Sequence, residues 1–144
     1  MGREEDEMAV LLVDVANVVG SRPDGWWRDR AGATSRLLAR VAPLTGRLLP
    51  APGGGRLVVT GIVAVVEGAA RHARAPDGIT VVAAPGSGDD ALVVEATRLA
   101  GEAEDVLVVT ADRGLRARLP TGVAVTGPVW LLTTLSGVTP EDAG

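Results

Sequence analysis

Four apolar runs dominate the pattern of hydrophobic and polar positions. They lie within Met8 to Val13, Arg56 to Val66, Ile79 to Ala84 and Val106 to Thr110. Each is short and rich in Val, Leu, Ile and Ala, which is typical of strands buried on both faces of a parallel sheet. A weaker run at 123–125 predicts an additional strand at one edge of the sheet.

Apolar residues at helical spacing lie between these runs. One stripe predicts a helix that ends near Pro43; its members are Trp27, Ala31, Thr34, Leu38 and Val41. A second helix is expected from Ser87 to about Ala100. Shorter ones are expected up to Ala73, after Asp112 and over 129–135. Strands that alternate with helices specify an α/β fold, with a mostly parallel sheet of four or five strands covered on both faces.

The length and composition fit one domain with a real core. The chain has 144 residues, of which 47% are hydrophobic, and no Cys. We expect a single domain over 8–135, a disordered acidic tail over 1–7 and a flexible tail over 136–144. The Pro- and Gly-rich stretch 50–55 reads as a flexible link within that domain. The acidic start does not fit a signal peptide, and the longest apolar run is too short for a membrane span, so a cytoplasmic protein is expected.

The charged residues narrow the possible chemistry. The net charge of −4 argues against coating nucleic acid by bulk attraction, but not against a nucleic-acid enzyme whose metal ions supply positive charge. All 14 basic residues are Arg, which excludes a phosphate loop with its Lys and a Schiff base. His72 is the only His and lies in a polar run. If the chain is an enzyme, carboxylates must carry the reaction.

Acidic residues follow each of the four predicted buried strands. These are Asp14, Glu67, the pair Asp89 and Asp90, and Asp112, with Asn17 three residues after the first. Ligands of open α/β sheets bind at the carboxyl ends of the strands, so we expect these side chains to share one site. Oxygen ligands without Cys or His favour Mg²⁺ or Mn²⁺. Two such ions about 4 Å apart can activate water for phosphodiester hydrolysis.

Each of these residues also has an ordinary structural interpretation. Asp112 could cap the following helix, and Asp14 and Asn17 could belong to a turn. Glu67 could be a solvated helix start. Ser87 could cap the helix that begins there, which would explain Asp90 but not the inward direction of Asp89 on the same face as Leu92.

Candidate substrate contacts lie near the same edge. Trp26 could stack on a base, although plain packing is the alternative, and Trp27 is expected in the core as part of the helical stripe. Arg28, Arg30, Arg113 and Arg116 could bind phosphates, with a solvated surface as the alternative.

These motifs resemble the NYN branch of the PIN-like nucleases, and most closely its bacterial subgroup of YacP-type ribonucleases. The similarity spans about Met8 to Val125 and rests on the acid-bearing segments; these are Asp14-x-x-Asn17, Val66-Glu67, Gly88-Asp89-Asp90-Ala91 and Val109-Thr110-Ala111-Asp112-Arg113. The resemblance implies a Rossmann-like PIN fold, a three-layer α/β/α sandwich, and a metal-dependent ribonuclease. It further implies Asp14, Asp89 and Asp112 as metal ligands, Glu67 and Asp90 as supporting acids, and Asn17 as the residue that orients the site.

Three functions therefore stay open at this stage. The first is a Mg²⁺- or Mn²⁺-dependent ribonuclease acting on RNA. The second is a metal-dependent nucleotide pyrophosphohydrolase acting on small nucleotides, which the acidic net charge favours slightly. The third is a non-catalytic binding module that keeps the fold.

Overall fold

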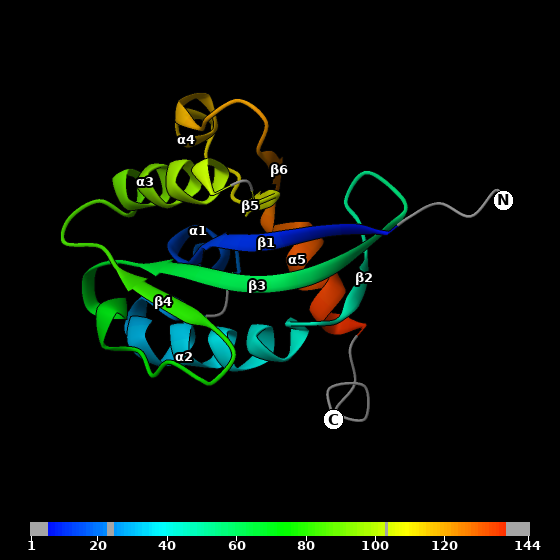
Figure 1. Cartoon of the computed structure of the whole chain (residues 1–144). Helices are drawn as coiled ribbons and strands as arrows, with labels where there is room; N and C mark the ends of the chain where they lie inside the picture. Colours follow the sequence, from blue (N-terminus) through cyan, green and yellow to red (C-terminus); the bar gives the residue numbers. More distant parts are fainter. Residues whose placement is uncertain (1–5, 23–24, 103, 138–144) are drawn as a thin grey trace, which may run out of the picture.

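The computed structural model describes residues 6–22, 25–102 and 104–137. It is a three-layer α/β structure in which helices cover both faces of one six-stranded sheet (Figure 1). The strands are β1 (Glu7–Asp14), β2 (Leu48–Pro50), β3 (Arg56–Val66), β4 (Thr80–Ala83), β5 (Val106–Val109) and β6 (Ala124–Thr126). The α-helices are α1 (Val15–Gly20), α2 (Arg30–Val41), α3 (Gly88–Gly101), α4 (Arg113–Arg118) and α5 (Pro128–Ser136). Three short 3-10 helices are η1 (Trp26–Arg28), η2 (Ala42–Leu44) and η3 (Gly68–His72).

The central strand is β1, which pairs in parallel with β3 on one side and β5 on the other. The order across the sheet is β2-β3-β1-β5-β6. β3 is long enough to pair twice: its first residues run antiparallel to β2, and its last four, Val63 to Val66, run parallel to β4. Five strands therefore point their carboxyl ends at the same edge of the sheet.

Each face of the sheet has its own hydrophobic core. The face covered by α1, α2 and α5 contains Leu11, Val13 and Leu38, all nearly inaccessible to solvent. The opposite face, covered by α3 and α4, contains Leu12 and Leu92. Successive β1 side chains point to opposite faces, and both faces are buried, so the strand is apolar without alternation. In Figure 1, α3 and α4 lie above the sheet and α2 lies below it.

The structure confirms the α/β fold class and the strands expected from the four apolar runs. The sheet has one strand more than expected because β2, only three residues long, was not foreseen. The stretch 50–55 is the loop of the β2–β3 hairpin and not a free link: Ala51 N–H donates to the Gly55 carbonyl at 3.0 Å. Gly54 and Gly55 supply the left-handed backbone that this turn needs.

Two local expectations need correction. α1 begins directly after Asp14, where no helix was predicted, because Asp14 caps it and its valines are buried. The first predicted helix starts at Arg30 and not near Trp27, which lies in η1 and is 57% exposed. Trp27 is therefore not a core residue, since the helical stripe begins one turn later.

The chain ends are described only in part. Glu7 belongs to β1 and the Asp6 carboxylate pairs with Arg56 at 3.1 Å, so these two residues of the expected acidic tail have defined contacts. Residues 1–5 and 138–144 lie outside the described residues. Among the helices of the described part of the chain, none has the length and apolarity needed to span a bilayer.

Candidate functional site

The carboxyl ends of the parallel strands carry the acidic residues singled out in the sequence. Asp14 is the last residue of β1, Glu67 follows β3, Asp89 lies in the first turn of α3, and Asp112 follows β5. The chain continues from β1 to β3 on one side and later returns to β5 on the other. This is the topological switch point at which open α/β sheets bind ligands. We call this side of the molecule, with these four residues, the acidic edge.

Asp14 is a buried carboxylate, 6% exposed. Its Oδ2 accepts a hydrogen bond from the Thr110 hydroxyl at 2.8 Å, and its Oδ1 accepts one from Asn17 N–H at 3.3 Å. Burial raises the pKa of Asp14, and these two hydrogen bonds oppose the rise without cancelling it. The charges of Asp89 and Glu67 raise the pKa further. The site therefore makes the negative charge of Asp14 costly unless a cation is near.

Thr110 connects two of these acids and was not singled out from the sequence. It is fully buried, and its hydroxyl also accepts the N–H of Asp112 at 3.1 Å. Its carbonyl accepts from the Arg116 guanidinium, at 2.8 Å from Nη2. The only local signal was a hydroxyl residue at the end of the apolar run Val106–Val109.

Asn17 joins α1 to the segment after β5. Its Oδ1 accepts the N–H of Ala111 at 2.8 Å. Because Ala111 lies between Thr110 and Asp112, this contact fixes the backbone that carries both side chains. The geometry fits the orienting role that the resemblance implies for Asn17.

Glu67 reaches the start of α3. Its Oε2 accepts the backbone N–H of Gly88, the first residue of that helix. Ser87 caps the helix as expected, since its hydroxyl oxygen accepts Asp89 N–H at 3.1 Å. Glu67 therefore ties the end of β3 to the first turn of α3.

Asp89 is half-buried and lies close enough to two other acids for their charges to act on it. Burial raises its pKa most, followed by the charges of Asp112 and Glu67, while Arg118 lowers it. Asp90, by contrast, is exposed and pairs with Arg118 at 2.7 Å. Of the two adjacent acids, Asp89 belongs to the acidic edge and Asp90 is held at its margin.

The acids influence one another, and three of them, Asp14, Glu67 and Asp112, also accept hydrogen bonds from groups of the protein. Asp112 caps α4 by accepting Leu115 N–H at 3.0 Å, and Asp14 and Glu67 bind the groups already described. Within the described residues, no three acidic or His side chains converge closely enough to hold a metal ion. The donors are nonetheless all carboxylate oxygens, each with several lone-pair positions, and this chemistry fits a hard cation such as Mg²⁺ or Mn²⁺.

The candidate substrate-binding residues have different environments. The Arg28 guanidinium lies over the exposed Trp27 ring, 5.9 Å from its centroid. Arg113 is exposed, whereas Arg116 is engaged with the Thr110 carbonyl and so has a structural contact. The side chain of Trp26 lies outside the described residues. Trp27, by contrast, lies at the surface.

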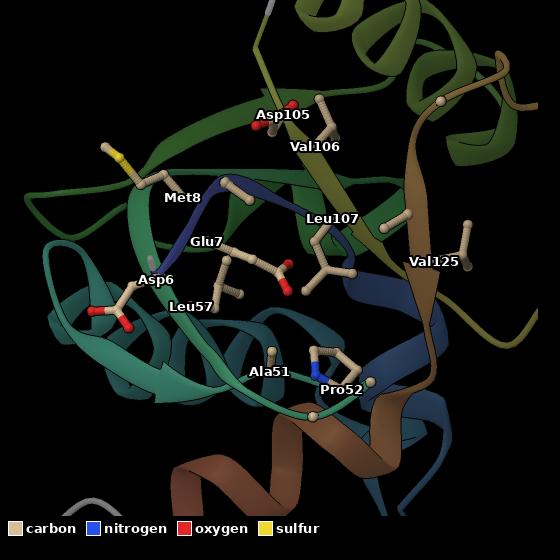
Figure 2. A pocket seen from close by; sticks show the side chains of 15 residues that line it. Asp6, Glu7, Met8, Ala51, Pro52, Leu57, Asp105, Val106, Leu107 and Val125 are labelled. Atoms are coloured by element: carbon tan, nitrogen blue, oxygen red, sulfur yellow. The ribbon is translucent and has the colours of Figure 1, made fainter. Parts of the chain in front are cut away.

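A cavity of about 740 Å³ lies at the opposite end of the sheet. Figure 2 shows Glu7, Leu57, Val106 and Val125 around it, near the amino-terminal ends of their strands. Its acidic members are Asp6, Glu7 and Asp105. Ligands of this fold type bind at the other end of the strands, so this cavity is separate from the acidic edge.

The strand order and the helices on both faces define a PIN-like α/β fold, in agreement with the fold that the sequence motifs implied. The structure is similar to the crystal structure of Rae1 (YacP) from Bacillus subtilis, with a TM-score of 0.67. The match covers 90% of this chain and 76% of that chain at 18% sequence identity, so it establishes the fold. No family model and no curated protein matches the chain.

Proposed function

We propose that this chain is a Mg²⁺- or Mn²⁺-dependent ribonuclease that hydrolyses RNA phosphodiester bonds at the acidic edge. The observation that carries the proposal is Asp14, a buried carboxylate at the switch point of the sheet whose pKa is raised by burial and by neighbouring acids. Groups with perturbed ionisation at such a position are candidates for function. The YacP-like fold and the resemblance of the motifs to the NYN branch support the same interpretation.

Asp14, Asp89 and Asp112 are the residues that would hold the ion, with Glu67 and Asp90 as supporting acids. A bound divalent ion would lower the pKa of a water molecule and neutralise charge on the phosphate. Thr110 and Asn17 would keep Asp14 and Asp112 in place through the hydrogen bonds described above. Arg28 and Arg113, both exposed, are the candidate phosphate contacts.

The decisive test is cleavage of labelled single-stranded RNA with Mn²⁺ or with a chelator. Wild-type protein should cut only with metal, and Asp14→Asn should lose at least 100-fold in rate, as expected when a group that stabilises transition-state charge is removed. Asp77→Asn, which removes one charge from an exposed turn, is the matched control and should cut normally. Equal cleavage by Asp14→Asn and wild type would rule out this site.

The acidic net charge keeps a pyrophosphohydrolase of small nucleotides as the second candidate. Hydrolysis of nucleoside triphosphates by a protein that leaves RNA intact would favour it. A folded protein that hydrolyses neither substrate and gains no thermal stability from Mn²⁺ would instead be a binding module, because a protein without a metal site gains nothing by linkage.

A further inference from the structure

A groove between α1 and α2 combines an apolar floor with basic residues. Its volume is about 260 Å³, and its lining consists of Val18, Val19, Ala33 and Leu37 with the arginines Arg22, Arg36 and Arg40. Sites that enclose a drug-sized molecule have volumes of about 300–1,000 Å³. The groove is smaller, so it fits one part of a long ligand lying across the surface better than an enclosed small molecule.

The arginines of the groove are arranged at some cost to the helix. Arg36 and Arg40 are four residues apart on α2, and like charges at this spacing destabilise a helix. Both are exposed, and in the part of the chain that the structure describes neither forms an ion pair. α2 contains no acidic residue that could offset them. An anionic ligand would remove this repulsion.

The groove is formed by the most basic part of an acidic sequence. Residues 15–78, which include α1, α2 and β3, contain nine Arg and four acidic residues. The rest of the chain contains five Arg and fourteen acidic residues. The negative net charge therefore conceals a surplus of positive charge in the segment that contains α2, and three of its arginines line the groove, where a polyanion would be attracted.

The groove also lies close to the acidic edge. Val18 and Val19 are four and five residues beyond Asp14, about 6–8 Å along α1 at the helical rise of about 1.5 Å per residue. η1, which carries the exposed Trp27, contacts both α1 and α2. A single-stranded nucleic acid with one phosphate at the acidic edge could thus continue past Trp27 into the groove.

We propose that the groove between α1 and α2 binds the sugar-phosphate backbone of single-stranded RNA beside the bond to be cut. Arg36 and Arg40, with Arg22, would contact phosphates, and the apolar floor would contact ribose or base. This inference rests on the proposed function, since it takes RNA as the ligand. The groove would be the site by which the protein distinguishes an RNA chain from a small nucleotide.

The test compares two double variants that lose the same charge. The groove variant carries Arg36→Ala and Arg40→Ala and so loses two arginines of the groove. The control variant carries Arg56→Ala and Arg98→Ala, which removes two arginines that pair with acids elsewhere in the protein. The affinity of each for a labelled single-stranded 12-mer is measured in chelator between 50 and 200 mM salt. Two lost phosphate contacts should reduce the slope of log affinity against log salt by about 1.4. Over this fourfold salt range, wild-type affinity should then fall about sevenfold more than that of the groove variant.

Cleavage gives the second measurement. With Mn²⁺, the groove variant should have a lower kcat/KM than wild type on the 12-mer and an equal kcat/KM on a dinucleotide, which is too short to reach the groove. The inference is overturned if the groove and control variants have the same salt slope and the same kcat/KM on the 12-mer. RNA that binds in a groove-dependent way but is never cut would overturn the proposed function and leave the groove inference standing.

Discussion

The carboxylate of Glu67 occupies the space in which a side chain at Gly88 would begin. A Cβ at position 88 would lie 3.2 Å from Cδ of Glu67, and closer still to the oxygen that accepts Gly88 N–H. A glycine at the start of α3 therefore lets a carboxylate from the end of β3 approach the helix backbone. The contact joins two acid-bearing segments that lie 21 residues apart in the sequence.

Gly88→Ala should destabilise the protein even though alanine favours a helix. The new methyl group displaces Glu67 and removes a charge-assisted hydrogen bond of about 1.5–3 kcal/mol, against a helix gain of up to about 1 kcal/mol. We expect a net loss of about 1 kcal/mol in urea unfolding. Gly101→Ala, in the same helix with open space around it, should be neutral or stabilising. In a Glu67→Ala background, Gly88→Ala should no longer destabilise; an unchanged loss there would show that Glu67 is not the cause.

Asp89→Asn should stabilise the protein at neutral pH. The folded-state pKa of Asp89 is raised by burial and by Asp112 and Glu67, so its ionised form is less favourable in the folded than in the unfolded state. This penalty is absent when the pH is below the unfolded pKa, for example at about pH 3, and it is fully present once the pH exceeds the folded pKa. We expect a gain of about 0.2–1 kcal/mol at pH 7, the range of partly exposed charge interactions. Thermal unfolding at pH 7 and at pH 3 measures this gain in stability, with Asp77→Asn as the control. An equal gain at pH 3 would contradict the electrostatic cause.

Thr110→Val should destabilise the fold more at neutral than at acidic pH. Valine keeps the shape but removes the hydroxyl that donates to Asp14 and accepts from Asp112 N–H. Leaving buried polar groups unpaired costs about 1–3 kcal/mol. Because the Thr110 hydrogen bond lowers the pKa of Asp14, its loss affects the ionised carboxylate most. Unfolding of Thr110→Val and of Thr110→Ser, which keeps the hydroxyl, should be compared across pH. A loss in Thr110→Ser as large as in Thr110→Val would indicate a packing effect.

Trp27→Ala should weaken RNA binding and leave stability almost unchanged. The ring is 57% exposed and its contact is with the exposed Arg28, so its removal should alter the free energy of unfolding by no more than about 1 kcal/mol. Loss of one stacked base would weaken binding by about 1–3 kcal/mol. The control is Val94→Ala, which removes an exposed apolar side chain from α3. Fluorescence anisotropy and urea unfolding measure the two effects, and a large stability loss with intact binding would make Trp27 a packing residue.

The sequence revealed the strands and the positions of the acids because both depend on local pattern. A strand buried on both faces must be continuously apolar, and an acid that ends such a strand is conspicuous. α1 was not predictable in this way: three of its six residues are Val and its last is Gly, all weak helix formers. It exists because Asp14 caps it and because its valines are buried, and that burial is a tertiary effect.

The hydrogen bonds that organise the acidic edge could not be predicted from the sequence either. Thr110 and Asp14 are 96 positions apart, and Asn17 and Ala111 are 94 apart. No periodicity reports such pairs, since they depend on β1 and β5 being neighbours in the sheet. The acids themselves could be named from the sequence, whereas the hydrogen bonds that orient them could not.

The short outer strands have a consequence for how the chain behaves in concentrated solution. β2 and β6 have three residues each and β4 has four, and in the described part of the chain these are the strands at the margins of the sheet. A long exposed margin would offer its backbone to another chain and seed fibrils or strand-swapped dimers. Here an incoming strand finds only a few residues to pair with on either side. This expectation would be contradicted if residues 48–50 and 124–126 became more protected from hydrogen exchange as the protein concentration increased. The eleven-residue β3, which is rich in Val and would favour aggregation if exposed, is covered at its two ends by short neighbours: β2 pairs with its first three residues and β4 with its last four.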